Sequence, residues 1–227
     1  MTDKSLQKTA LVTGASRGLG AAFAETIAKA GYHVIAVART VGGLEELDDR
    51  IQAAGGQATL APMDVTEDGA MQHLCRSTYD RWGGVDLWVH AAIHAATLSP
   101  SEMIDEKEWT KSWQTNVEAT RRLIAYVSPL LRARKGARAI FFDDGFHGQK
   151  FFGVYGATKA AQRALVQSWQ AETAKTGPHV DLLLPRPMPT ALRGRFFPGE
   201  DKSQLTKPIA EAERLWATIP VDTPVET

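Results

Sequence analysis

The sequence predicts an α/β protein, a doubly wound parallel sheet of about six strands with helices on both faces. Short apolar runs alternate with helix-length segments as far as residue 184, which is the pattern of βαβ units. The first run leads directly into a glycine-rich turn and then a helical segment. The length of 227 residues suits one domain with one core. We therefore interpret residues 1–227 as a single domain.

Each predicted strand is a short apolar run, and each is followed by a helical pattern. The runs are Ala10–Thr13, His33–Ala38, Ala58–Ala61, Leu87–Ala91, Ala139–Phe142 and Val180–Leu184. Crossovers between parallel strands are right-handed, and ligands bind outside the carboxyl ends of the strands. Functional residues are therefore expected just after these runs. A last helix is expected near Ile209–Thr218, with no convincing seventh strand after it.

Composition points to a small-molecule partner. Lys and Arg total 26, as do Asp and Glu, so the formal net charge is zero and nothing suggests binding to nucleic acid or an anionic membrane. The single cysteine, Cys75, excludes an intrachain disulfide. The first residues lack the apolar segment of a signal peptide, and no run approaches the ~20 residues of a membrane span. We expect a cytoplasmic protein.

The turn after the first run has the composition of a phosphate cradle. It reads Thr-Gly-Ala-Ser-Arg-Gly-Leu-Gly over residues 13–20. Glycines let the backbone turn tightly and approach a pyrophosphate, while the N–H groups of the helix start point at the anion. The alternative is a glycine-rich turn without a ligand. The residues expected to bind the cofactor here are Gly14, Ser16, Arg17, Gly18, Leu19 and Gly20.

The end of the second run predicts which dinucleotide is bound. An NAD site offers an acid to the ribose hydroxyl about 20 residues past the glycine turn. This chain has Arg39 there, and an arginine matches a 2′-phosphate bidentately. Arg17 could approach the same phosphate. The sequence therefore predicts NADP(H), unless both are ordinary surface arginines.

Tyr155 and Lys159 form the second chemical motif. A spacing of four residues puts the phenol and the ammonium on one helix face. The nearby cation favours the phenolate, so we expect it to lower the pKa of Tyr155 and to suit that group for proton transfer.

Together, the Gly-x-x-x-Gly-x-Gly turn and the Tyr-x-x-x-Lys pair resemble the short-chain dehydrogenase/reductase family. The resemblance covers about residues 8–217, and the tail resembles a YciK-like bacterial branch. It implies a Rossmann-type domain in which Lys159 also holds the nicotinamide ribose. Asn116 would lie at a helix distortion that binds a water linking the lysine to solvent.

The same resemblance places further residues around the cofactor. It implies that the Asp64 carboxylate and the Val65 amide hold the adenine, although Asp64 could instead cap the next helix, since Glu67 lies three residues on. Ala91 ends the fourth run and Ala92 follows it, and both would contact the cofactor. Pro185 and Thr190 would line the nicotinamide.

Several positions depart from the family pattern. Family members place a serine donor at the end of the fifth run, where this chain has Asp143 and Asp144. An ionised aspartate would repel an oxyanion and raise the pKa of the tyrosine, whereas a protonated one could donate. His147 is a second candidate donor. Ile93 and Arg186 each replace a family glycine, and Arg186 would either crowd the nicotinamide or offer an anion site. His90 and His94 lack a third ligand at metal spacing, so no metal is expected.

Two longer segments carry expectations about assembly and access. Helices at Trp109–Arg134, interrupted by Pro129, and at Val154–Lys175 correspond to those that pair around a twofold axis in the family. We expect a homodimer, with a homotetramer as the alternative. A small-residue face suits such pairing, though it could equally pack on the sheet; it comprises Ala157, Ala160, Ala161 and Ala164. Residues 191–207 are a candidate substrate lid or a plain surface loop.

Two functions follow from these observations. The first is an NADPH-dependent oxidoreductase that interconverts a carbonyl compound and an alcohol, with Tyr155, Lys159, Asn116 and Asp144 or Asp143 as catalytic residues. The second is a catalytically inactive NADP(H)-binding relative that acts as a sensor or a partner subunit. The intact Tyr-x-x-x-Lys pair favours the first, and the missing serine favours the second.

Overall fold

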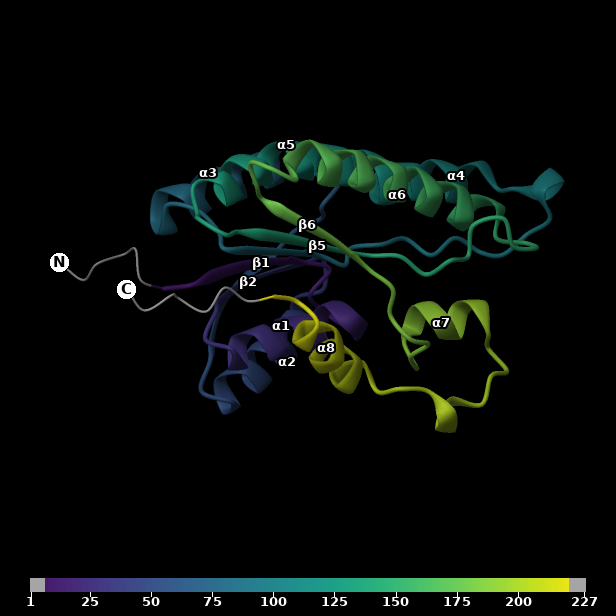
Figure 1. Ribbon diagram of the computed structural model, residues 1–227. Helices are drawn as coiled ribbons and strands as arrows, with labels where there is room; N and C mark the ends of the chain where they lie inside the picture. The colour runs from purple at the N-terminus through teal and green to yellow at the C-terminus, as the bar shows by residue number, and fades with distance from the viewer. Residues whose placement is uncertain (1–6, 221–227) are drawn as a thin grey trace.

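A computed structural model describes residues 7–220 and shows one six-stranded sheet with all strands parallel (Figure 1). The strand order is β3-β2-β1-β4-β5-β6. The strands are β1 (Thr9–Thr13), β2 (His33–Ala38), β3 (Gln57–Pro62), β4 (Leu87–His90), β5 (Arg138–Phe142) and β6 (His179–Leu183). Each coincides with one predicted apolar run, and the predicted doubly wound α/β fold is confirmed. The expected lack of a seventh strand concerns residues 221–227, which lie outside the described part.

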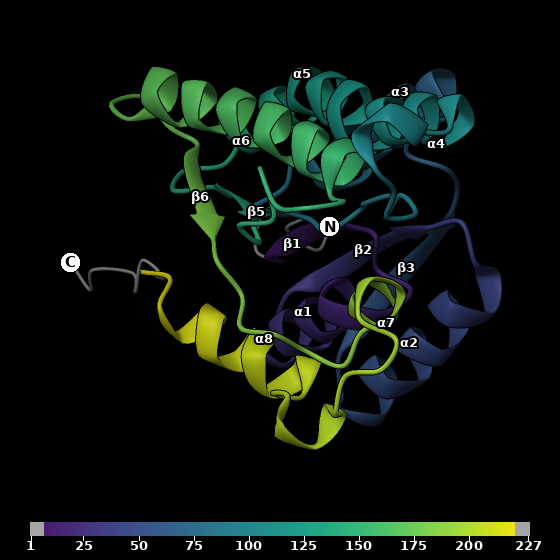
Figure 2. The same cartoon turned by 90° about the vertical axis from the view of Figure 1, so that its right-hand side faces the viewer.

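Helices cover both faces of the sheet, as Figure 1 shows. One layer contains α3 (Asp68–Trp82), α4 (Glu106–Ser112), α5 (Ala119–Arg132) and α6 (Gly153–Thr173). The other contains α1 (Gly18–Lys29), α2 (Val41–Ala53) and α8 (Pro208–Ala217). The short helix α7 (Ala191–Phe196) lies beyond the carboxyl ends of the strands (Figure 2). Two short 3-10 turns span Ser101–Met103 and Lys202–Gln204.

Strands β1, β2 and β4 are buried along their whole length, so the sheet divides its side chains between two cores. Val12 and Val34 pack with Phe23 of α1. Their neighbours Leu11 and Ile35 point to the opposite core, which α3, α5 and α6 cover. This two-residue alternation follows from the pleat. It explains why the strands appear in the sequence as continuous apolar runs.

The segment predicted as one helix interrupted at Pro129 is built differently. Helix α5 continues through Pro129 to Arg132, and the irregular turn lies earlier, where Trp113–Glu118 form a π-helix between α4 and α5. Pro129 is exposed and lies in the last turn, so the helix loses only the one bond to the carbonyl four residues earlier and ends soon after. The helical segment is therefore interrupted at the π-helix, which contains Asn116, and not at Pro129.

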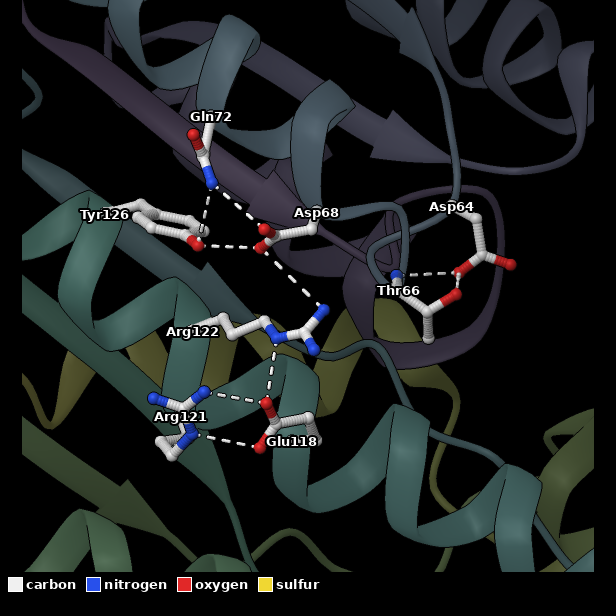
Figure 3. A network of polar contacts seen from close by, with 8 residues as sticks. All are labelled: Asp64, Thr66, Asp68, Gln72, Glu118, Arg121, Arg122 and Tyr126. Carbon is white, nitrogen blue, oxygen red and sulfur yellow. Dashed lines mark hydrogen bonds and ion pairs between the residues drawn. The ribbon is translucent and has the colours of Figure 1, made fainter.

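The outer surfaces of α3, α5 and α6 differ in character. A polar network joins α3 to α5, in which the Tyr126 hydroxyl donates to Asp68 at 2.6 Å (Figure 3). On α6, Ala157, Ala160 and Ala164 are exposed. These three alanines therefore do not pack on the sheet.

Within residues 7–220, no helix is long and apolar enough to cross a membrane.

Candidate active site

The glycine loop joins β1 to α1 at the carboxyl edge of the sheet. The amides of Gly14 and the next residue donate to the Val37 carbonyl at 2.9 and 3.1 Å, which holds the loop against β2. A Cβ on Gly14 would lie 2.5 Å from the backbone nitrogen of Ala92, so the close contact with the end of β4 requires glycine. Gly18 has φ +59°, and a Cβ there would meet only the Thr190 side chain, at 3.5 Å. The start of α1, whose first N–H groups have no partner within the helix, therefore lies next to Thr190, which follows β6.

Arg39 and Asp64 lie together after β2 and β3. An Arg39 nitrogen is 3.4 Å from Asp64 Oδ2, and 56% of the arginine side chain is exposed. The other carboxylate oxygen accepts from the backbone and hydroxyl of Thr66, both at 2.9 Å (Figure 3). Helix α3 begins later, with Glu67 as its N-cap. Asp64 is therefore not a helix cap, and one of its oxygens faces the arginine.

Tyr155 and Lys159 are buried on one face of α6, with 2% and 6% of their surfaces exposed. The Tyr155 hydroxyl donates to Asp144 Oδ2. The Lys159 ammonium donates to the carbonyl of Phe142, the last residue of β5. The helix spacing thus brings both side chains to the carboxyl end of β5, where Asp144 follows.

The electrostatics of the pair differ from the sequence expectation. Burial, together with the carboxylates of Asp144 and Asp143, raises the pKa of Tyr155 well above its usual 10.0. Burial lowers the pKa of Lys159, and the same two carboxylates oppose that shift. The expectation that Lys159 lowers the pKa of the phenol is therefore wrong for this state, because burial and Asp144 dominate. The structure does show the other expected effect, in which an aspartate near the phenol raises the pKa of Tyr155.

The structure distinguishes the two aspartates. Asp144 contacts Tyr155, whereas Asp143 Oδ2 lies 3.5 Å from an Arg163 nitrogen and the other oxygen of Asp143 accepts the Asp144 amide at 2.9 Å. The other candidate donor, His147, is exposed and lines a groove on the outer side of α6. Asp144 therefore occupies the position beside the phenol.

The cradle after β1 and the buried tyrosine–lysine pair after β5 thus meet at one edge of a doubly wound sheet. The model of the short chain dehydrogenase family matches residues 8–201. The chain belongs to the short-chain dehydrogenase family. The family consists of oxidoreductases, and the predicted resemblance is confirmed.

Individual relatives of this short-chain dehydrogenase agree with the assignment. An uncharacterized oxidoreductase of Staphylococcus saprophyticus is 32% identical over 209 residues, which cover 90% of this chain and 88% of the relative. The solved structure of the oxidoreductase yciK from E. coli has a TM-score of 0.85 at 26% identity and covers 95% of this chain and 91% of that one. A short chain dehydrogenase from Escherichia coli CFT073, solved in complex with NADPH, has a TM-score of 0.83 at 27% identity, with 94% and 91% covered.

In this short-chain dehydrogenase, Asn116 lies fully buried in the π-helix. Its side-chain oxygen accepts from the His94 amide at 2.7 Å, and its side-chain nitrogen donates to the His94 carbonyl at 3.0 Å. The same nitrogen donates to the Thr158 hydroxyl at 3.0 Å. Asn116 thereby ties the loop after β4 to α6. The local helix distortion expected at this residue is present.

An aromatic cluster covers the part of α6 that carries Tyr155. Phe196 of α7 lies edge-on to the Tyr155 ring with centroids 4.8 Å apart, and Phe152 lies 5.0 Å from Phe196. Phe146 stacks on Phe152 at 4.6 Å. Ile93, which replaces a family glycine, packs against the same cluster. The sequence analysis missed this contact, since nothing in the pattern links α7 to Tyr155.

Helix α7 is also tied to α4 by polar contacts. Glu108 Oε2 accepts the Thr97 amide at 3.0 Å and lies 3.3 Å from His94 Nε2. An Arg195 nitrogen lies 3.5 Å from the same oxygen and donates to the Thr97 hydroxyl at 3.0 Å. Helix α7 therefore packs onto the site, while residues 201–204 further along the same segment are exposed.

The segment after β6 is anchored at its base. The Arg186 amide donates to Glu211 Oε1 at 2.7 Å, and this fully buried carboxylate also binds Arg214 at 2.6 Å. The Arg186 side chain is exposed, and its charge acts on Glu211.

Most predicted cofactor-binding residues share one edge of the sheet because each follows the carboxyl end of a strand. They are Gly14, Ser16, Arg17, Gly18, Leu19, Gly20, Arg39, Asp64, Val65, Ala91, Ala92, Pro185 and Thr190.

Proposed function

We propose that the protein is an NADPH-dependent oxidoreductase that reduces the carbonyl group of a small molecule to an alcohol, or catalyses the reverse reaction. The observation that carries this proposal is the buried Tyr155–Lys159 pair with Asp144 on the phenol. A donor that is shielded from water and held beside a cation is suited to give a proton to a carbonyl oxygen. The solved E. coli relative with NADPH supports the choice of cofactor.

The residues present fit an NADP(H) molecule. At the start of α1 a Cβ on Gly18 would meet only the Thr190 side chain, and the N-cap, Arg17, makes no side-chain capping bond. The free N–H groups there would hold the pyrophosphate. Arg39 would bind the 2′-phosphate and exchange its contact with Asp64 for it, which would free that carboxylate for the adenine. When bound, NADPH supplies the hydride that adds to the carbonyl carbon.

The chain's own residues handle the proton. Tyr155 gives its hydroxyl proton to the carbonyl oxygen and becomes a phenolate. Lys159 stabilises that phenolate by charge and holds the nicotinamide ribose. Asp144 accepts from the Tyr155 hydroxyl in this structure, so its role is to orient the phenol and to pass a proton from solvent to the phenolate. Asn116 holds the loop after β4 and α6 in place.

A second function also has an observation in its favour. Tyr155 donates to Asp144, and Phe196 covers its ring, so the phenol is occupied in this state. An NADP(H)-binding protein without turnover, acting as a sensor or partner subunit, would show the same arrangement. In the reductase, residues 191–207 form a lid and α7 moves to admit the substrate.

One experiment separates the two functions. NADPH oxidation is followed with a panel of ketones and aldehydes between pH 5 and 9, on the wild type and on Tyr155→Phe. We expect turnover that falls at least about 10²-fold in the variant, because a positioned acid contributes that much. Tight NADPH binding without Tyr155-dependent turnover on any carbonyl would favour the binding function.

The cofactor preference has its own test. We expect tighter binding of NADPH than of NADH, by about ten- to hundredfold, because charge-assisted bonds to the 2′-phosphate are lost with NADH. Arg39→Asp should abolish or reverse this preference in a fluorescence titration. The exposed Arg132→Asp on α5 is the matched control. A wild type that prefers NADH would contradict the role of the arginines.

We also propose a homodimer, with a homotetramer as the alternative. The exposed alanines of α6 support it, because a small-residue face permits close approach of a second helix. Ala157 and Ala160 line a groove of about 550 Å³ that continues to the exposed Phe151. Helix α6 packs beside α4 and the π-helix that precedes α5, the other helix expected at the twofold axis.

A further inference from the structure

Lys159 has a buried partner that the reaction scheme above does not use. Its ammonium donates to Gln162 Oε1 at 2.8 Å. Gln162 lies one turn further along α6 and is only 5% exposed. A buried polar side chain beside a catalytic cation is held there by its hydrogen bonds.

The other end of the Gln162 amide is bonded as well. Its nitrogen donates to the Asn116 carbonyl at 3.1 Å and to the Thr120 hydroxyl at 2.9 Å. The orientation of the amide is fixed, because an ammonium only donates and a carbonyl only accepts. Both amide hydrogens are thus engaged, and Asn116 and Thr120 are fully buried. Gln162 therefore fills the space between Lys159 and the π-helix.

Resting on the proposed function, we propose that Gln162 is a positioning residue that fixes Lys159 and closes the path between its ammonium and the π-helix to water. An amide has no readily titrated proton, so it cannot pass protons as a chain of waters can. The proton that Tyr155 gives to the substrate must then be restored from another side. The geometry points to Asp144, which is half-buried and bonded to the phenol.

The proton balance is simple. The Tyr155 O–H bond breaks as the proton moves to the substrate oxygen, which leaves a phenolate. The Asp144 carboxylate takes a proton from an acid of the solvent, a hydronium ion or a buffer acid, and passes it to that phenolate, which restores the tyrosine and regenerates the carboxylate. The charged or titratable groups that face this pair are Asp143 and its partner Arg163, and on β4 His90, whose imidazole feels the charge of Lys159.

The positioning role is tested without cofactor or turnover. In protein labelled with ¹⁵N in the lysine side chains, NMR measures the exchange of the Lys159 ammonium protons, assigned with Lys159→Met. We expect Gln162→Met to speed this exchange by at least about tenfold, since a charge-assisted bond is lost. Gln162→Glu, which keeps the acceptor, should restore slow exchange. Gln170→Met, which removes a bond from the same helix to the Val180 carbonyl of β6 and lies several turns from Lys159, is the matched control.

The proton route is tested by a double-mutant cycle. Asp144→Asn should lower kcat by about 10²-fold, because the carboxylate that passes the proton is lost. In Gln162→Ala, a water can enter among Lys159, Asn116 and Thr120, which offer it three polar partners. In the Gln162→Ala background, Asp144→Asn should lower kcat by only about tenfold or less, and the pH profile of kcat should change as well.

The outcomes separate the two claims. Exchange that is equal in Gln162→Met and Gln170→Met would overturn the positioning role. Additive losses in the cycle would overturn the route. A wild type that reduces no carbonyl would refute the proposed function and the route with it, while the exchange rates would still decide the positioning role.

Discussion

Among single residues, His90 joins three elements that meet beneath the glycine loop. Its Nδ1 lies 2.7 Å from the Thr13 hydroxyl on β1, and its Nε2 lies 3.1 Å from the Thr120 hydroxyl on α5. Burial, helped by the charge of Lys159, lowers the pKa of His90 to about 3. The ring is therefore neutral and structural, and it ties β4 to β1 and to α5.

His90 should make the fold sensitive to acid. The unfolded chain takes up a proton near the ordinary pKa of 6.5, whereas the folded state resists protonation until about pH 3. The stability that the neutral ring contributes is complete above pH 6.5 and is lost as the pH falls toward 3. The expected slope is roughly 1.4 kcal/mol per pH unit.

Urea unfolding at pH 7 and pH 4.5 measures this contribution. His90→Asn should lose less stability on acidification than the wild type, even if it is less stable at pH 7. His179→Asn, at an exposed position, is the control. Equal losses in the wild type and His90→Asn would show that His90 is not the acid-sensitive group.

Among the elements, α7 is the hardest to predict from the sequence, although its Phe196 contacts Tyr155. The strands could be predicted because buried parallel strands are apolar throughout, and the glycine loop and Tyr155 follow them at fixed places. The contact of Phe196 with Tyr155 could not be predicted, because it joins distant segments of the chain through packing alone. Gln162 was missed for another reason: a Lys-x-x-Gln spacing on α6 is a weak signal until Asn116 is seen on the facing helix.

The contacts of Glu108 predict how firmly α7 is held. Glu108→Gln removes the charge that attracts Arg195 and weakens the acceptor for the Thr97 amide. We expect trypsin to cleave after Arg195 several-fold faster in this variant, because α7 opens more often. Glu106→Gln, at an exposed position of the same helix, should behave as the wild type. Identical cleavage rates in all three proteins would show that Glu108 does not hold α7.

At the scale of the whole molecule, the exposed alanine face of α6 predicts self-association. Ala160→Arg would place a long charged side chain in the groove, so we expect light scattering at micromolar concentration to show a dimer for the wild type and a monomer for this variant. Ala53→Arg, at the exposed end of α2, is the control and should leave the dimer intact. A monomeric wild type would refute the proposed assembly.

The bond between the Arg186 amide and buried Glu211 has a consequence for how this chain can diversify. Helix α8 packs on α1, so the stretch from residue 187 to residue 207 leaves and rejoins the body of the protein at two fixed points. A different stretch of similar length can be grafted between Thr190 and α8 while Thr190 keeps its place against Gly18 of the glycine loop. We expect such an exchange, by natural drift or by design, to change the surroundings of Tyr155 and leave the sheet as it is.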